Sequence, residues 1–512
     1  MNQQYLFDPV SCDKYDLLTR EQLIDLHKGE QQMRLHFQKY SEELLQRFEI
    51  VDQKNFLIGE QLVNVKNTLY GKSSERSPKI PKDKDDKSEK NKKVKIQLPS
   101  LRYPNAPLVE KDIELAELPN CNACGKEMED SGLTEDSEQL TTIPRHFSVV
   151  RYKRHKYRCS CCHGDLVTAP ALPKIKEGSS YSDEMIIDVA LSKYCDLIPN
   201  DRYVAMAKRA GIIDLPPNSL IQLTHNLADF LEVIYKNLKT EIINSKVIHA
   251  DETPHRMLEG DDNSNWSLWG FSSKIASYFE AHSTRSGDVA IEFLKDANCE
   301  FLVSDVYSGY NKAVRITNEY RVKNGKLEIV KIYCNAHARR KFKDSVINFE
   351  VESNYFIKCY RKIYRLEKLK ATEDFSYEKK RAWQRIYFKL MERKAISLRN
   401  SYPPKGSIGK ALGYFINNYL ELTLFLKYEE VPIDNNAQER LMRGPVIGRK
   451  TWYGNHSRRG AITSAILFSI VESCKLNSIN PRIYFNDIVN MIHQGQEALT
   501  PSQYANIADL KR

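Results

Sequence analysis

Acidic residues follow two short apolar runs in the middle of the chain. Residues 247–250 end at Asp251, and residues 301–304 end at Asp305. Short apolar runs bounded by turn formers are typical of buried strands. A carboxylate at the end of a buried strand is costly unless it is paired or coordinates something, and hard oxygen ligands suit Mg²⁺. Two such ions, about 4 Å apart, can activate a nucleophile and stabilise the leaving oxygen of a phosphodiester.

A third acid lies far downstream in a polar run. Glu439 falls within residues 434–440, and Asp434 and Glu472 are alternatives for the same role. On a helix, Glu439 and Arg443 would be four residues apart, so a local ion pair is another interpretation. We expect the cations of this region to contact DNA phosphates: Arg440, Arg443, Arg449 and Lys450.

His337 follows another apolar run and is itself followed by a group of cations. We expect His337 to act in catalysis, by orienting a scissile phosphate or neutralising charge in the transition state. The cations beside it are expected to contact DNA: Arg339, Arg340 and Lys341. The alternative is a solvated, basic helix start.

Two Cys-x-x-Cys pairs have the spacing of zinc ligands. We expect Cys121, Cys124, Cys159 and Cys162 to hold one Zn²⁺, with Cys161 able to replace one of them. A closed four-thiolate site is structural, so this metal is not the catalytic one. Basic and aromatic residues alternate between the pairs, a pattern that can grip a phosphate backbone and stack on bases. The expected DNA contacts there are Arg151, Lys153 and Arg154, although an exposed basic strand would have the same pattern.

The acids must be positioned by strands and helices whose order can be predicted. We expect strands at 246–250, 266–272, 276–282, 301–304 and 329–333, with a helix at 287–297. Three strands, a helix and two more strands is the pattern of the ribonuclease H-like fold, in which the first and fourth strands are neighbours. Asp251 and Asp305 would then lie side by side. As an alternative, Asp251 could cap a helix with Pro254 in its first turn.

The whole chain is predicted to be a multidomain α/β protein with six regions. The first three regions are a helical, coiled-coil-like N-terminal region (1–71), a charged linker (72–118) and a zinc-binding domain (119–178). A helical region with a possible helix-turn-helix (179–240) and a ribonuclease H-like catalytic domain (241–450), with a helical insertion at about 345–430, follow. The last is a C-terminal helical region (451–512), in which Pro481 is predicted to end a helix.

The N-terminal helix, at 20–70, has apolar residues at steps of three, four or seven. This spacing favours a coiled coil and hence self-association, although a helix packed within its own domain has similar spacing. The apolar positions are Met33, Phe37, Tyr40, Leu44, Val51, Ile58, Leu62, Val65 and Leu69.

Composition limits the class of protein. The 512 residues carry a net charge of +10 and are 28% charged, which fits a polyanionic partner without requiring one. The eleven cysteines do not form the pattern of a secreted disulfide framework. The N-terminus lacks the pattern of a secretory signal, and no apolar stretch approaches a membrane span. We therefore expect a protein of the reducing cytoplasm, associated with the nucleoid when bound to DNA, and no membrane partner.

Taken in order, these motifs resemble the transposases of insertion-sequence family 66, the large catalytic subunit sometimes called TnpC. The matching segments are the two cysteine pairs and residues 71–75, 192–194, 249–254, 304–310, 336–342, 431–440 and 446–450. The resemblance implies a DDE transposase with Asp251, Asp305 and Glu439 as its metal-binding triad. One departure is Asn335, where family members commonly have Trp, and it is expected to alter packing beside His337.

The expected activity is cleavage at the ends of an insertion sequence and transfer of the 3′ ends to target DNA. It would use two Mg²⁺ (or Mn²⁺) ions, which can serve both in-line displacements. Expected partners are the terminal inverted repeats, target DNA, further copies of the chain and two small accessory proteins of the element. The alternatives are a ribonuclease H-like nuclease or resolvase without strand transfer, and a non-catalytic, zinc-dependent DNA-binding regulator.

Overall fold

A computed structural model describes residues 19–70, 99–102, 147–158, 166–258, 265–369 and 375–510. It divides into two compact units: Met1–Lys72, Pro170–Tyr203 and Pro216–Arg512 form the larger, and Ser73–Ala169 with Val204–Leu215 form the smaller. The four expected zinc ligands and Cys161 lie outside the described residues, as does most of the expected linker.

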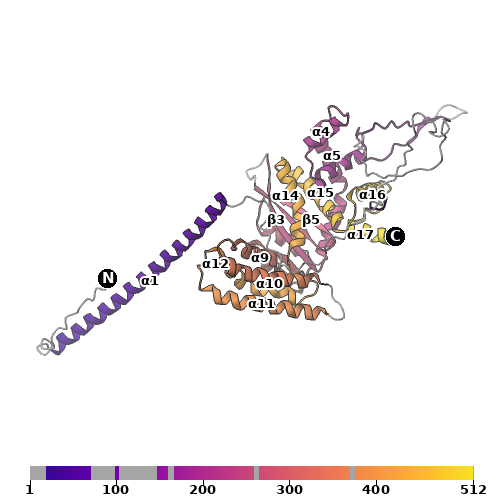
Figure 1. The fold of residues 1–512 in the computed structure, drawn as a ribbon. Helices are drawn as coiled ribbons and strands as arrows, with labels where there is room; N and C mark the ends of the chain where they lie inside the picture. The colour runs from indigo at the N-terminus through magenta and orange to yellow at the C-terminus, as the bar shows by residue number, and fades with distance from the viewer. Residues whose placement is uncertain are drawn as a thin grey trace, which may run out of the picture. The chain divides into compact units, whose positions relative to one another are not determined.

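The larger unit is built on one five-stranded mixed sheet, in the order β5-β4-β3-β6-β7. β3 (Val247–Arg256), β4 (Asn265–Ser272) and β5 (Ser277–His282) form an antiparallel meander, and β6 (Phe301–Ser304) and β7 (Val330–Tyr333) run parallel to β3. The predicted strands are therefore confirmed, and so is the prediction that the first and fourth strands are neighbours. Figure 1 shows this sheet between the helical layers of the larger unit.

β3 is longer than predicted. It was expected to end at Ala250, but its pairing with β4 continues through Pro254, opposite Ser267. Pairing with β6 stops at His249, opposite Val303, so the second half of β3 keeps a ladder partner on one side only. Proline is tolerated on such an edge, because its missing N–H is not needed there. The alternative in which Asp251 caps a helix is wrong.

Two helices connect the strands, and only the first was predicted. α7 (Asp288–Lys295) buries Val289, Ile291 and Phe293. α8 (Ser308–Lys323) joins β6 to β7 and packs on α7. It was missed because its buried face includes glycine, threonine and arginine as well as apolar residues, which weakens the apolar periodicity.

The predicted insertion is helical, but its last segment is broken. α9 (Asn335–Asp344) leads into α10 (Glu350–Lys368), α11 (Tyr377–Arg399) and α12 (Ser407–Asn417). The last part of the predicted insertion, 408–428, is divided into α12, a short α13 (Tyr419–Thr423) and a 3₁₀ turn.

The insertion and the sheet share one core. Phe301 of β6 belongs to the same buried cluster as Phe342, Phe356 and Phe415 of the helices. The rings of Phe342 and Phe356 are stacked with centroids 4.1 Å apart. Burial of this size makes the insertion part of the folding of the larger unit, not an appendage to it.

Four helices follow the insertion: α14 (Asn436–Trp452), α15 (Arg458–Leu476), α16 (Pro481–His493) and α17 (Pro501–Leu510). α15 ends before Pro481, as predicted, but this proline also begins α16, because the first turn of a helix does not need its N–H. No single helix of the described ranges has the length and apolar composition of a membrane span; α15 and α16, bent by 116°, meet that test as a pair.

α15 covers the edge of the sheet. The hydroxyl of Ser469 accepts the N–H of Phe279 at 2.8 Å, and that of Ser473 accepts the N–H of Ser277 at 2.9 Å. These bonds satisfy backbone donors that an uncovered edge strand would expose. Figure 1 shows α14 and α15 lying over the strands.

The predicted helical region before the sheet contains α3 (Asp183–Tyr194), α4 (Asn200–Arg209), α5 (Pro217–Phe230) and α6 (Glu232–Ile243). A second helix of the possible helix-turn-helix would span about 220–235. It is interrupted at Leu231, between α5 and α6.

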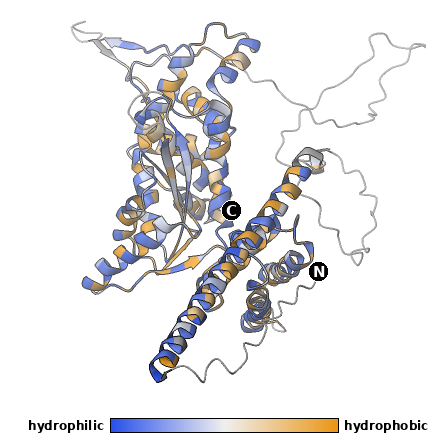
Figure 2. Cartoon of the chain, turned by 90° about the vertical axis from the view of Figure 1, so that its left-hand side faces the viewer, coloured by the Kyte–Doolittle hydropathy of each residue, from blue (hydrophilic) through white to orange (hydrophobic). Residues whose placement is uncertain are grey.

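The N-terminal helix is confirmed as α1 (Arg20–Tyr70). Phe56 stacks on Phe349 with centroids 5.8 Å apart, and Glu60 accepts the N–H of Ser407 at 3.1 Å at the start of α12. Most of its apolar side chains remain exposed, including Met33, Phe37, Tyr40, Val51, Ile58, Leu62 and Val65. Figure 2 shows apolar residues recurring along the length of this helix.

Candidate functional site

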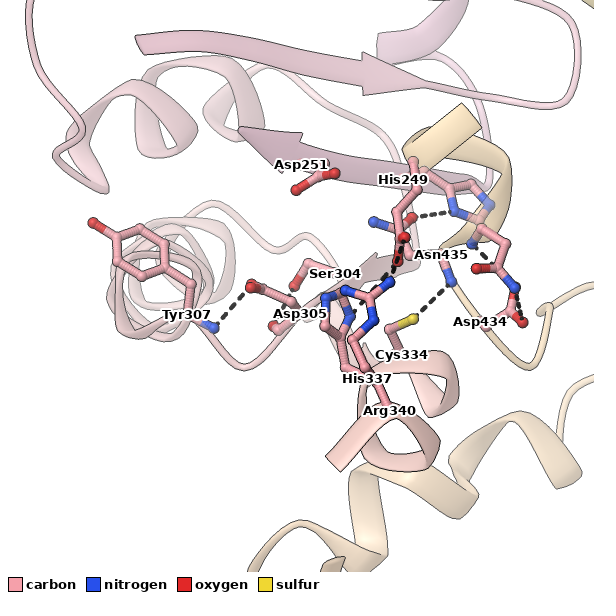
Figure 3. A network of polar contacts seen from close by, with 12 residues as sticks. His249, Asp251, Ser304, Asp305, Tyr307, Cys334, His337, Arg340, Asp434 and Asn435 are labelled. Atoms are coloured by element: carbon pink, nitrogen blue, oxygen red, sulfur yellow. Dashed lines mark hydrogen bonds and ion pairs between the residues drawn. The ribbon is translucent and has the colours of Figure 1, made fainter. Parts of the chain in front are cut away.

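The first two acids meet where β3 and β6 diverge. Asp251 lies two positions beyond the last β3–β6 pair, and Asp305 directly follows β6. Asp305 accepts the N–H of Tyr307 at 2.9 Å, and Asp251 accepts the N–H of Glu252 at 3.0 Å. Figure 3 shows Asp251 and Asp305 on neighbouring segments of the same site. The structure therefore brings together the two acids that the sequence predicted to be adjacent.

The Asp251 carboxyl is in an environment that disfavours its charge. Burial raises its pKa to about 8, and the nearby carboxylates of Glu252, Asp305 and Glu439 add to this effect. Apart from the backbone N–H of Glu252, which lowers the pKa, the main causes of the shift are burial and these carboxylates. Several carboxylates gathered around Asp251 raise its pKa, an electrostatic condition that a bound divalent ion would relieve.

Glu439 lies in the first turn of α14 and faces α9. Its Oε2 accepts a hydrogen bond from Arg340 at 3.3 Å, and its Oε1 is 3.7 Å from Nδ1 of His337. The expected ion pair is thus formed with Arg340 of another helix, not with Arg443 of its own.

The other two acids considered for the third position have partners elsewhere. Asp434 accepts the N–H of Asn436 at 3.0 Å, at the start of α14. Glu472 is buried in α15, where it pairs with Lys475 at 2.8 Å. Of the three alternatives, Glu439 is the one among the main causes of the raised Asp251 pKa.

Asn435 ties the start of α14 to the ends of two strands. Its amide nitrogen donates to the carbonyl of Ala250 at 2.8 Å, and its side-chain oxygen lies 2.7 Å from Nδ1 of His249. Its backbone N–H donates to the Cys334 sulfur at 3.2 Å. Because the amide nitrogen is used on Ala250, the amide oxygen must accept, so Nδ1 of His249 carries the hydrogen. Burial lowers the pKa of His249, which keeps this imidazole neutral.

Asn335, which stands where the resembling transposases commonly have Trp, is a second buried residue that hydrogen-bonds several segments together. Its amide nitrogen donates to the carbonyls of Leu422 at 2.8 Å and Ile433 at 3.1 Å, and its oxygen accepts from Tyr360 at 3.2 Å. The bonds hold the segment before α14 against α9 and α10. The polar run 434–440 indicated that this part of the chain carries site residues. Only the buried hydrogen bonds of the structure show that Asn435 and Asn335 hold the start of α14 in place.

Glu252 was not predicted as a site residue, yet it is almost fully buried behind Asp251. Tyr310 donates to it at 2.7 Å, and Arg285 donates to it at 2.7 and 3.1 Å. The Arg285 guanidinium also lies over the Tyr307 ring, 4.7 Å from its centroid. Adjacent residues of a strand point to opposite faces of the sheet. The contacts of Glu252 with Tyr310 and Arg285 therefore stabilise the face between β3 and α8, while Asp251 faces α14.

The cations after His337 point in different directions. Arg340 forms an ion pair with Glu439. Figure 3 shows Arg340 beside His337. The guanidinium of Arg339 instead lies 5.5 Å from the centroid of Tyr364, and Nζ of Lys341 lies 4.9 Å from that of Tyr414. Only Arg340 of the three therefore contacts an acid of the site.

The cations of α14 are spread around the helix. Arg440, Arg443 and Lys450 are exposed, whereas Arg449 is half-buried and lies 3.5 Å from the Thr253 hydroxyl.

In the smaller unit, the basic residues Arg151, Lys153 and Arg154 are exposed. They precede β1 (Lys156–Arg158), which pairs antiparallel with β2 (Leu166–Thr168). The alternating basic and aromatic segment thus leads into a short two-stranded ribbon.

One group of side chains in the described ranges has metal-ligand geometry with all its ligand atoms within 4.8 Å of one another: Cys334, His337 and Glu439. Asp251 and Asp305 lie outside that group. The candidate site therefore has a pair of acids on the strands and a mixed sulfur, nitrogen and oxygen group on the helices.

Comparison with known proteins agrees with this geometry. Residues 178–463 match the family described as transposase IS66 family, and residues 119–163 match the zinc-finger binding domain of transposase IS66. The latter range contains all four expected zinc ligands.

Relatives that match over about three quarters of their length occur in Sinorhizobium fredii (strain NBRC 101917 / NGR234). The uncharacterized protein y4hP is 24% identical over 75% of this chain and 72% of its own length, and y4jD is 24% identical over 74% and 76%. The match to the transposase family covers more than half of the chain. The mixed α/β protein described above therefore belongs to the IS66 family of transposases.

Proposed function

We propose that the protein is a DDE-type DNA transposase that cuts the ends of an insertion sequence and joins the 3′ ends to target DNA. Asp251, Asp305 and Glu439 are its metal-binding acids. The observation that carries the proposal is the place of Asp251 beside Asp305 and Glu439, where burial, Glu252 and these two acids together raise its pKa to about 8. The sheet order supports a ribonuclease H-like core, because its three antiparallel strands are followed by two parallel ones beside the first.

The acids fit hard divalent cations. Carboxylate oxygens are the ligands that Mg²⁺ and Mn²⁺ prefer. When bound, two such ions supply an activated oxygen nucleophile and charge neutralisation at the scissile phosphate. The proposal assigns both ions to the three carboxylates.

The chain's own residues fix where these oxygens lie. The backbone N–H of Tyr307 holds Asp305, and the Asn435 bonds fix the start of α14, one turn before Glu439. Arg340 and His337 are placed to contact a DNA phosphate beside the acids, and no nucleophilic side chain is required. Catalysis then depends on positioning and on compensation of charge.

The DNA-binding and assembly roles are part of the same proposal. The zinc-finger match supports one Zn²⁺ held by Cys121, Cys124, Cys159 and Cys162, in a domain that binds element ends. The exposed cations of the ribbon segment and of α14 would contact phosphates. α1 would bring copies of the chain together. The domain limits, the accessory proteins and these contacts remain predictions.

A joining assay separates the alternatives. A pre-cut element end is incubated with a target plasmid and Mg²⁺, and joined products are counted. A transposase joins the two DNAs, a nuclease or resolvase only cuts, and a regulator only binds. Asp251→Asn and Asp305→Asn should abolish joining, whereas Asp296→Asn, at an exposed acid after α7, should not. Joining that persists in the Asp251→Asn protein would contradict the assignment.

A further inference from the structure

We propose that Cys334, His337 and Glu439 form a second metal site, for a thiophilic divalent cation such as Zn²⁺, beside the acid pair. Its occupation would withdraw Glu439 from the Mg²⁺ reaction and so inhibit the transposase. The binding step stands on the geometry alone, and only the inhibition rests on the proposed function.

The three ligands come from the ends of two helices. Cys334 ends β7 and caps α9, and His337 lies one turn further on in α9. A Cys-x-x-His spacing at a helix start places both side chains on the same side of the first turn. Glu439 approaches from the first turn of α14, and the Asn435 N–H that donates to the Cys334 sulfur keeps the two helix starts together.

Two of the ligand atoms are buried without hydrogen-bond partners. These are Nδ1 of His337 and Oε1 of Glu439, and they face each other at 3.7 Å. Leaving such atoms unsatisfied is costly, and each one calls for an explanation. A cation between them would satisfy both. Bond lengths to zinc of about 2.0–2.3 Å separate tetrahedral ligand atoms by about 3.3–3.8 Å, so this pair already has the spacing of co-ligands.

The donor set selects the kind of ion. Sulfur, imidazole nitrogen and one carboxylate oxygen suit Zn²⁺, Co²⁺ or Cd²⁺, whereas Mg²⁺ prefers oxygen alone. Arg340 occupies Oε2 of Glu439 and leaves Oε1 available. On binding, the Cys334 thiol forms a sulfur–metal bond and releases its proton to solvent. Cys334 itself is buried, but His337 and Glu439 are partly exposed, so an ion can enter from their side and keep an open fourth position.

Cobalt provides a direct test of binding. Full-length protein whose zinc segment is filled with Zn²⁺ is titrated with Co²⁺, and the sulfur-to-cobalt charge-transfer band is followed. We expect one further Co²⁺ per chain with a thiolate band in the wild type. Cys334→Ser should remove the band, while Cys474→Ser, at a buried cysteine of α15, should leave it. The site is disproved if the wild type shows no such band or the Cys334→Ser protein keeps it.

His337→Gln is a second test in case the buried substitution Cys334→Ser prevents folding. His337 is partly exposed, so its replacement should leave the fold intact. We expect it to weaken Co²⁺ binding at least tenfold with unchanged near-ultraviolet circular dichroism. Binding as tight as in the wild type would overturn the proposal even if the Cys334→Ser protein failed to fold.

The inhibition is tested separately in the joining assay with Mg²⁺ and added Zn²⁺. Each variant is compared with its own activity without Zn²⁺, and Cys334→Ser should need at least tenfold more Zn²⁺ for half-inhibition. Equal sensitivity would disprove inhibition through this site. A thiolate–cobalt band in a protein that joins no DNA would support the metal site and contradict the proposed function, so the two failures are distinguishable.

Discussion

The Asp251 carboxyl lies largely out of solvent among other acids, and burial and those acids raise its pKa. This arrangement costs folding free energy in the absence of metal, because a buried charge without a partner is unfavourable. Structural ion pairs in the same unit look different: buried Glu472, for example, has Lys475 at 2.8 Å. The contrast is what separates a site acid from a structural one.

Asp251→Asn should abolish cutting and joining, because an amide cannot replace the charge that holds the metal. End binding should remain within about threefold of wild type, since most of the affinity of such proteins comes from phosphate contacts elsewhere. Cleavage gels and filter binding measure the two effects. Loss of binding together with cutting would instead make Asp251 a structural residue.

The same substitution should have a pH-dependent effect on stability without metal. An unfolded aspartate ionises near pH 4, whereas the folded Asp251 does so near pH 8. Between these values ionisation favours the unfolded chain, so the wild type loses stability as pH rises and Asp251→Asn does not. We expect the advantage of the variant to grow by about 3.6 kcal/mol from pH 5 to pH 8. Urea unfolding with EDTA measures it, and an advantage independent of pH would refute it.

At the scale of elements, the site depends on where α14 begins. Asn435 bonds to Ala250, His249 and Cys334, so β3, the end of β7 and the start of α14 meet at a single residue. Glu439 lies one helical turn later. A shift of this helix start would move Glu439 away from the acid pair.

Asn435→Ala should destabilise the larger unit by about 3 kcal/mol, because it leaves the buried Ala250 carbonyl and His249 nitrogen unsatisfied. Joining should fall at least tenfold as Glu439 loses its position. Asn436→Ala is the matched control, since the side chain of Asn436 bonds only to Asp434 of its own turn. Urea midpoints and joining rates test both variants, and equal effects of the two would contradict the role of Asn435.

Much of this arrangement could be predicted, and the failures have physical causes. The strands carrying Asp251 and Asp305 were predictable because buried strands are short, apolar runs. The continuation of β3 to Arg256 was not, because pairing with β4 outweighs the local signal of Pro254. α8 was missed because its buried face is partly polar. The roles of Asn435 and Asn335 could not be recognised from the sequence. A buried amide contributes through the groups to which it hydrogen-bonds, and these become known only from the structure.

At the scale of the molecule, the smaller unit is expected to carry the zinc. Cys124→Ser should remove one Zn²⁺ per chain and weaken binding to the element ends about tenfold at fixed salt. Cys195→Ser, at a half-buried cysteine outside the zinc motif, is the control. Atomic absorption and gel shifts measure the two effects, and unchanged zinc content would refute the ligand assignment.

α1 leaves a long row of apolar side chains exposed, with only a few contacts to the insertion. Isolated helices of this kind gain stability by packing against another copy. Deletion of residues 1–71 should therefore convert an oligomer to a monomer, as measured by light scattering after size exclusion. The prediction fails if the full-length and shortened chains have the same number of subunits.

The late position of Glu439 has a consequence for protein synthesis. A nascent chain that has emerged only as far as the insertion already has Asp251 and Asp305, but the residue that completes the set and the asparagine that seats it are still to be made. Ribosome stalling, frameshifts or premature stop codons before residue 434 would all yield polypeptides without a finished triad. Under the proposed function, the segment from residue 434 onwards, roughly the last sixth of the chain, completes the metal-binding acids, so a chain released before it is made would not cut DNA.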